Sequence, residues 1–204
     1  MILDNAPYLY VDHKYGTTKI TLIEAPGPDD WMAVYRRALI CQNQHPVHPP
    51  TSEWIFKILR ARHSPIRKAS YSFEFEDIPS NTSTHLARHK HADAYVGSLR
   101  VDRITPEYLK KLMKSFGKNI DGDSAPRVSP TSMIYDTNAE EIQVFMNKRL
   151  CYQASELTRL IAEGMKRLVI RETPEMKSLL IPMCERCGGI CYEMKPCGRW
   201  KGIV

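Results

Sequence analysis

The chain has 204 residues, 43% of them hydrophobic and 25% charged, which is long enough to bury one substantial core in a single compact domain. No run approaches the roughly 20 apolar residues that cross a bilayer, and no basic leader precedes an apolar run at the start, so we expect a soluble, cytoplasmic protein. The formal net charge of +6 favours an anionic partner, although the basic residues are spread along the chain.

Hydrophobic periodicity predicts a strand and two helices in the first 60 or so residues. Residues 17–25 carry apolar Ile20, Leu22 and Ala25 between Gly16 and Pro26, which predicts the first strand. Apolar residues recur at helical spacing after Asp30, and again after Thr51 or Ser52, either of which can cap a helix. The prolines within 42–50 lack a backbone N–H and cannot donate the hydrogen bonds of a helix or a sheet, which predicts a loop between the two helices.

The middle of the chain alternates extended and helical patterns. Residues 69–77 alternate aromatic and polar side chains, as in a strand with one covered face. A short polar helix over 80–91 and a second extended segment over 93–101 are expected to follow. A helix should begin at Pro106, and the Gly, Asp, Ser and Pro content of 118–130 predicts a loop.

Helix formers dominate residues 137–173 and predict a helix long enough to act as a central strut. Its expected buried stripe consists of Leu157, Leu160, Ile161, Leu168 and Val169. Residues 174–182 predict a short final helix. Cys41 and Cys151 lie on apolar helical stripes, which favours core positions for both.

One segment concentrates side chains suited to an anion. Arg88, His89 and Lys90 are adjacent at the expected end of a helix, and Ser98 and Arg100 lie on the next extended segment. Together they can surround a phosphate from two sides. On chemistry alone, this pattern predicts either a phosphate or dinucleotide site or a solvated basic turn.

This segment resembles the signature of the flavin-dependent thymidylate synthases, Arg-His-Arg followed seven residues later by Ser, with Lys90 in place of the second Arg. Other stretches agree in order and spacing, so the resemblance covers most of residues 19–182. It implies an α+β fold, a single domain with a central, mostly antiparallel sheet flanked by helices. We expect this domain to span 1–182, with residues 183–204 forming a Cys-rich tail packed on it.

The resemblance also implies roles for individual residues. The residues expected to contact the flavin are His63, Ser64, Arg88, His89, Lys90 and Asn138. Those expected to bind the nucleotide are His85, Ser98, Arg100, Arg127 and Arg149. Arg149 would be catalytic, polarising the pyrimidine ring as charge develops on it. Judged from the residues alone, ordinary surface or ion-paired arginines are the favoured interpretation of Arg127 and Arg149.

The implied reaction is reductive methylation of dUMP to dTMP, with FAD as the cofactor and NADPH and methylenetetrahydrofolate as co-substrates. The implied assembly is a homotetramer whose partner is a nucleotide, not a membrane or a nucleic acid. Two departures keep alternatives open, because His85 stands where the family has Gln and Arg67 where it has Glu. The alternatives are an enzyme that hydroxymethylates or methylates another pyrimidine nucleotide, and a non-catalytic relative that binds nucleotides or nucleic acid.

Four cysteines crowd into the C-terminal segment at positions Cys184, Cys187, Cys191 and Cys197. Thiolates at this spacing predict a metal centre in a reducing compartment, with zinc as the default and an iron–sulfur cluster as the other choice. Such a centre would staple the tail to the domain, since few apolar residues follow Pro182. Free thiols or surface disulfides are the alternative.

Overall fold

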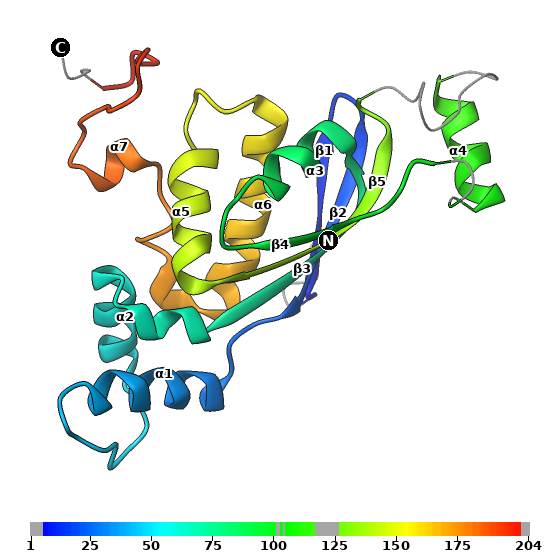
Figure 1. Ribbon diagram of the computed structural model, residues 1–204. Helices are drawn as coiled ribbons and strands as arrows, with labels where there is room; N and C mark the ends of the chain where they lie inside the picture. Colours follow the sequence, from blue (N-terminus) through cyan, green and yellow to red (C-terminus); the bar gives the residue numbers. More distant parts are fainter. Residues whose placement is uncertain (1–5, 101–102, 104, 117–126, 201–204) are drawn as a thin grey trace.

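The computed structural model describes residues 6–100, 103, 105–116 and 127–200. Within them, the strands form one open sheet (Figure 1). They are β1 (Tyr8–His13), β2 (Gly16–Glu24), β3 (Ser70–Pro79), β4 (Asp93–Val96) and β5 (Pro130–Asn138). The spatial order is β1-β2-β3-β5-β4, and every neighbouring pair is antiparallel. The predicted α+β fold with a central antiparallel sheet is therefore confirmed.

Helices cover one side of this sheet and extend beyond its ends. They are α1 (Pro28–Ile40), α2 (Ser52–Ala61), α3 (Ser80–Ala87), α4 (Pro106–Phe116), α5 (Ala139–Arg149), α6 (Glu156–Glu172) and α7 (Met183–Arg186), with short 3-10 turns η1 (Ser64–Lys68) and η2 (Pro174–Met176). In Figure 1, α5 and α6 stand side by side against the sheet, α1 and α2 lie at one end of the molecule, and α4 lies at the other. None of the helices in the described part of the chain is long and apolar enough to cross a membrane.

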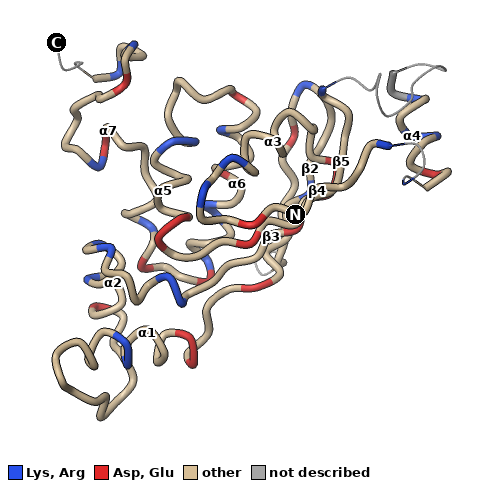
Figure 2. Tube along the Cα trace, in the orientation of Figure 1, with Lys and Arg blue, Asp and Glu red and all other residues tan. Residues whose placement is uncertain are grey.

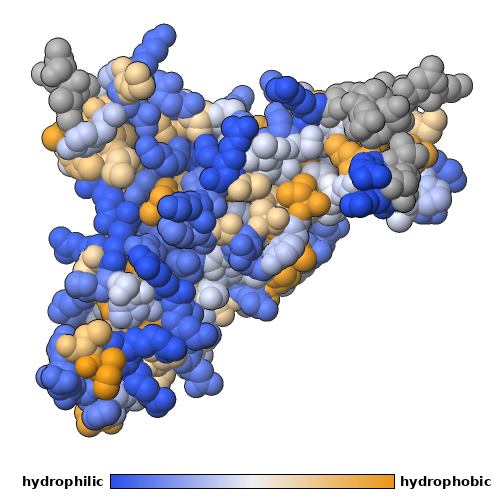
Figure 3. Space-filling view, viewed as in Figure 1, coloured by the Kyte–Doolittle hydropathy of each residue, from blue (hydrophilic) through white to orange (hydrophobic). Residues whose placement is uncertain are grey.

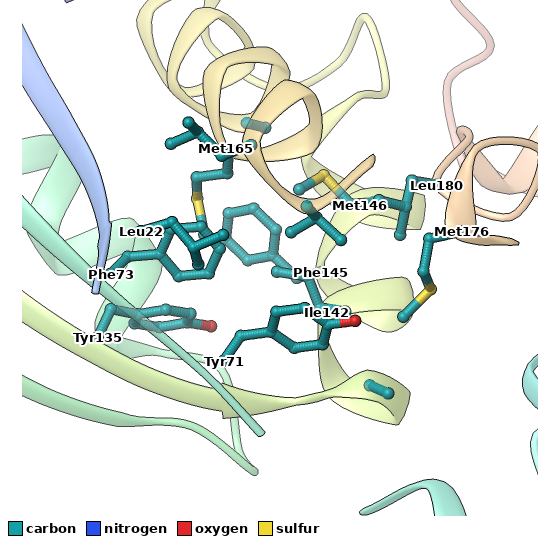
Figure 4. Packing of buried hydrophobic residues seen from close by; sticks show 14 of the residues in the cluster. Leu22, Tyr71, Phe73, Tyr135, Ile142, Phe145, Met146, Met165, Met176 and Leu180 are labelled. Atoms are coloured by element: carbon teal, nitrogen blue, oxygen red, sulfur yellow. The ribbon is translucent and has the colours of Figure 1, made fainter. Parts of the chain in front are cut away.

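The core lies between the sheet and the α5–α6 pair. Tyr71, Phe73 and Phe75 alternate along β3 and are fully buried, as the sequence pattern predicts. Across the strand pair, Tyr135 and Met133 of β5 are in register with Phe73 and Phe75 and are also buried. Figure 4 shows Tyr71, Phe73 and Tyr135 packed beneath the helices. Burying each large side chain contributes about 1.5–3 kcal/mol, so this aromatic layer fixes α5 over β3 and β5.

The contact between α6 and the first hairpin depends on a glycine. A Cβ placed on Gly164 would lie 2.8 Å from Cδ1 of Ile20 and 3.0 Å from Cγ2 of Val11. A glycine costs a helix interior about 1 kcal/mol relative to alanine. Here it lets α6 pack closely against β1 and β2 without displacing the side chains of Ile20 and Val11.

Several predicted elements agree with the structure. The strand over 69–77 is β3, the prolines of 42–50 do lie in a loop, and a helix begins at Pro106. Thr51 caps α2 by accepting a hydrogen bond from the backbone N–H of Trp54. Most of the predicted 118–130 loop falls outside the described residues.

Other predictions were wrong. The strand predicted over 17–25 is present as β2, but it is not the first, because β1 precedes it. Strand β5 occupies residues 130–138, for which the sequence predicts no strand. The helix predicted over 137–173 is two helices, because Ser155 starts α6 by accepting from the N–H of Thr158. On α6, Leu160 is exposed, unlike the rest of the predicted stripe.

Candidate functional site

The signature residues lie where the end of α3 meets one face of α5. Glu141, Phe145 and Arg149 are spaced four residues apart on α5, so they share that face. Helix α3 ends at Ala87, and the chain then places the ring of His89 4.8 Å from the ring of Phe145. His89 therefore packs over the middle of this face and can reach both ends of it.

His89 bridges Glu141 and Arg149 through its two ring nitrogens. Nδ1 lies 2.9 Å from Oε1 of Glu141, and Nε2 lies 3.0 Å from Nε of Arg149. An arginine can only donate, so Nε2 of His89 must be the unprotonated acceptor. The proton is then on Nδ1, which donates to the carboxylate, and the imidazole is neutral.

The surroundings of His89 favour the same protonation state. The side chains of His89 and Glu141 are only 8% and 5% exposed. Burial lowers the pKa of His89, and the charge of Arg149 acts in the same direction, whereas the hydrogen bond to Glu141 opposes them. A neutral His89 thus holds the guanidinium of Arg149 in a fixed orientation. A further N–H of Arg149 donates to the backbone carbonyl of His85 at 2.9 Å.

A second arginine converges on the same place. Arg88, the exposed C-cap residue of α3, is close enough for its charge to act on both His85 and Arg149. Burial lowers the pKa of each of these two groups first, and the Arg88 charge lowers both further. Among the described residues, no carboxylate pairs with the side chain of Arg88 or Arg149. We call His85, Arg88, His89 and Arg149 the basic corner.

The basic corner suits an anionic ligand. Two guanidinium groups held near each other repel, and a bound phosphate or carboxylate would relieve that repulsion while accepting their hydrogen bonds. Figure 2 shows basic residues gathered along the turn that leaves α3, and Figure 3 shows mainly hydrophilic side chains over the surface in the same view.

Tyr135 adds an unsatisfied polar group behind the corner. Its hydroxyl is buried and has no hydrogen-bond partner among the described residues. Burial raises the pKa of Tyr135, so the phenol stays neutral, and it feels the charges of both Glu141 and Arg149. Orphaned buried hydroxyls are rare in proteins, so this one marks a place where a ligand or water can be hydrogen-bonded. Neither Glu141 nor Tyr135 was singled out from the sequence, because no local motif contains them.

Three further residues expected to contact the flavin lie along α5 outside the basic corner. Asn138 caps α5 at its N-terminus, where its side-chain oxygen accepts from the N–H groups of Glu140 and Glu141. His63 caps η1 and Ser64 begins it, and this turn packs against α5, where the preceding Arg62 donates to Gln143 and Asn147. Since α5 has 11 residues, Asn138 lies about 16 Å from Arg149 along the helix axis.

The nucleotide residues are also divided. The carbonyl of Arg127 accepts hydrogen bonds from the Ser80 hydroxyl and the Asn81 N–H at the start of α3, one helix length from the basic corner. Ser98 follows β4 and accepts from the backbone N–H of Arg100, while Lys90 is exposed beside the corner. The structure thus brings together His85, Arg88, His89 and Arg149, and separates them from Arg127.

The cysteine tail adjoins a cavity. A cavity of about 260 Å³ lies beside the C-terminal end of α5 and is lined by residues from that end and from the tail. Nowhere in the described ranges do three or more His, Cys, Asp or Glu side chains stand close enough together to hold a metal ion. The prediction of core positions for two further cysteines was wrong, because Cys41 is exposed and Cys151 is half-buried at this cavity.

Fold and site together describe an α+β protein with a basic corner fitted to an anionic ligand. Among solved structures, thymidylate synthase X from Helicobacter pylori, crystallised with FAD and dUMP, has a similar fold. The two structures superpose with a TM-score of 0.59 at 16% sequence identity, over 79% of this chain and 96% of the other. At that identity, the similarity establishes the fold alone. No family profile and no curated protein sequence matches the chain.

Proposed function

We propose that this protein is a flavin-dependent enzyme that adds one carbon to carbon 5 of a pyrimidine deoxynucleotide. The reaction that the signature favours is reductive methylation of dUMP to dTMP, with FAD as cofactor and with NADPH and methylenetetrahydrofolate as co-substrates. The observation that carries the proposal is the convergence of Arg88 and Arg149 beside His85. The fold shared with a protein crystallised with FAD and dUMP supports it.

The residues present fit phosphate-bearing ligands. Arg88 and Arg149 offer charged donors without a carboxylate partner among the described residues, and Tyr135 offers a buried hydroxyl. The groups at the two ends of α5 are too far apart for one small ligand. An elongated dinucleotide, or a site shared between protomers of a homotetramer, would use both. A bound flavin would supply the redox chemistry, and the protein would align the reactants.

Arg149 is suited to act on the reacting base. A guanidinium has five N–H donors, and contacts with His89 and the His85 carbonyl occupy two of them. The others can meet a pyrimidine carbonyl on which negative charge builds during carbon transfer. The Glu141–His89 pair holds the guanidinium in place beforehand, so little reorganisation accompanies the reaction. His89 is in this respect a positioning residue.

His85 favours a second candidate substrate. Its Nδ1 lies 3.1 Å from the hydroxyl of Thr158, which leaves Nε2 as the ring nitrogen available to a ligand. A single ring nitrogen cannot reproduce the donor and acceptor pair of the family's Gln. The alternative substrate is therefore a pyrimidine deoxynucleotide other than dUMP, which the enzyme would methylate or hydroxymethylate. Assaying uracil and cytosine deoxynucleotides side by side distinguishes the two.

The test begins with cofactor binding. The purified protein should carry or take up FAD, and Arg88→Ala should release most of it, because a charged contact to phosphate contributes about 1.5–3 kcal/mol. Absent flavin absorbance together with no uptake of added FAD would refute the proposal. Unchanged FAD occupancy in Arg88→Ala would show that Arg88 does not bind the flavin.

Turnover tests the role of Arg149. Arg149→Ala should lower turnover on the preferred deoxynucleotide by about tenfold to a thousandfold, the effect of losing one preorganised charged donor. Arg167, an exposed arginine on α6, supplies the matched control, and Arg167→Ala should leave turnover unchanged. Wild-type turnover with only a raised KM in Arg149→Ala would show that Arg149 merely binds the nucleotide.

A further inference from the structure

Five of the six cysteines line the cavity beside the end of α5. They are Cys151, Cys184, Cys187, Cys191 and Cys197. Cys151 belongs to the turn between α5 and α6 in the body of the domain, whereas the other four come from the tail. The cavity therefore joins thiols from two parts of the chain that the sequence separates by more than 30 residues.

The tail is held over Cys151 by polar contacts that do not involve thiols. The side-chain amide of Gln153 donates to the carbonyl of Lys195 at 2.8 Å, and Lys148 pairs with Glu193 at 3.6 Å. Both contacts connect the α5 end and the following turn to the stretch between Cys191 and Cys197. The packing of the tail on the domain therefore brings the thiols to one cavity.

Glycines shape the loop that carries the first two tail cysteines. Gly188 and Gly189 have φ values of +68° and +89°, a left-handed conformation that other residues rarely adopt. The N–H of Gly189 donates to the carbonyl of Cys184 at 2.8 Å, and the N–H of Cys187 donates to that of Met183 at 2.9 Å. The loop turns back on itself tightly, as metal-binding Cys-x2-Cys loops do.

The thiols differ in how far they are shielded from solvent. Cys191 is buried, and Cys151, Cys184 and Cys187 are half-buried, whereas Cys197 is exposed. Cys151 also lies close enough to Cys184 for the two groups to interact electrostatically. Four shielded thiols, one of them from the domain body, therefore line the cavity together with an exposed fifth.

A cluster and a single ion need different spacings between the thiols. A zinc ion with Zn–S bonds of about 2.3 Å draws four sulfurs to within about 3.8 Å of each other. In the part of the chain that the structure describes, no three potential ligands are grouped closely enough to hold a metal ion, and the five cysteines are among the fifteen residues that line about 260 Å³ of space. A four-iron cluster also takes four cysteines, but it places an inorganic body between them.

We propose that Cys151, Cys184, Cys187 and Cys191 bind a four-iron iron–sulfur cluster in this cavity, with Cys197 as a non-ligand. This assignment adds Cys151 to the centre predicted from the tail and replaces Cys197. Because Cys151 follows Arg149 by two residues, the cluster fastens the tail to the end of α5 next to the basic corner. The cluster does not depend on the flavin reaction, and either can exist without the other.

The test is metal content. The full chain is purified without oxygen, incubated with ferrous iron, sulfide and a thiol reductant, and freed of unbound ions by gel filtration. Iron and acid-labile sulfide are then measured chemically, so bound flavin does not contribute. We expect about four of each per chain. Cys151→Ser should lower iron at least fourfold, while Cys197→Ser and the control Cys41→Ser, outside the cavity, should keep the wild-type content.

Three results would overturn the proposal. They are a wild-type chain that binds no iron or takes up a single zinc instead, a Cys151→Ser variant that keeps its iron, and a Cys197→Ser variant that loses it. Far-UV circular dichroism of each variant shows whether it has folded. If Cys151→Ser does not fold, Cys151→Ala and Cys184→Ser replace it, with the same expected loss of iron.

Discussion

Replacing Glu141 with alanine should destabilise the protein while leaving both arginines of the basic corner in place. The carboxylate is the acceptor for Nδ1–H of His89, and both side chains are less than a tenth exposed. Without it, a buried donor has no partner, which costs about 1–3 kcal/mol. The lost side-chain methylene adds about 0.8 kcal/mol. We therefore expect the free energy of unfolding to fall by about 2–4 kcal/mol.

Glu141→Gln separates the hydrogen bond from the side chain's bulk. The amide oxygen of glutamine can still accept from Nδ1–H, and only the charge assistance is lost, so the expected cost is about 1 kcal/mol. Urea unfolding at pH 7.5, where His89 is neutral, measures both variants. The slope of unfolding free energy against urea should be unchanged.

A double-mutant cycle with His89→Ala isolates the pair. If the bond carries the effect, Glu141→Ala should cost at least 1 kcal/mol less in the His89→Ala background than in wild type. Equal costs in the two backgrounds, or equal costs for Glu141→Ala and Glu141→Gln, would refute the assignment of His89 as a neutral bridge. Arg149 would then need another explanation for its orientation.

Two further predictions concern pH and packing. The pKa values of His85 and His89 lie below their ordinary 6.5, so below that pH the unfolded chain binds protons that the folded chain does not. Stability should therefore fall as pH drops below about 6.5, and urea midpoints that stay constant from pH 7.5 to 5 would contradict this. Gly164→Ala should be nearly neutral, because a helix-propensity gain of about 1 kcal/mol offsets the displacement of the Ile20 methyl end. Gly164→Val should instead cost about 1–3 kcal/mol through overpacking, and equal urea midpoints for the two variants would argue against a close approach at this glycine.

Strands with one buried apolar face were readable from the sequence, whereas strands with polar inward residues were not. In β3, Tyr71, Phe73 and Phe75 mark the covered face by themselves. In β5, the buried positions include Thr131 and Thr137, and these polar residues interrupt the alternation of apolar and polar side chains that indicates a strand. Pairing with β3 and cover from α5 make this segment a strand, and both are tertiary effects that override local preference.

The break between α5 and α6 was missed for a related reason. Residues 150–155 lie within a run of good helix formers, and the cap at Ser155 is worth only about 1 kcal/mol. A single long helix would carry its second half away from the sheet. Two shorter helices can both bury their apolar faces against the sheet. This burial contributes far more free energy than helix propensity or the cap at Ser155.

The sequence by itself determined the signature at residues 88–90, the antiparallel α+β fold class that it implied, and the cluster of cysteines in the tail. Only the tertiary structure decided which partners these residues meet. His89 contacts Glu141 and Arg149 across 52 and 60 residues of chain, and Cys151 joins a tail that begins 32 residues later. No local pattern encodes such meetings, because they depend on how helices pack over a shared core, where burial of apolar surface selects the arrangement and the polar groups follow.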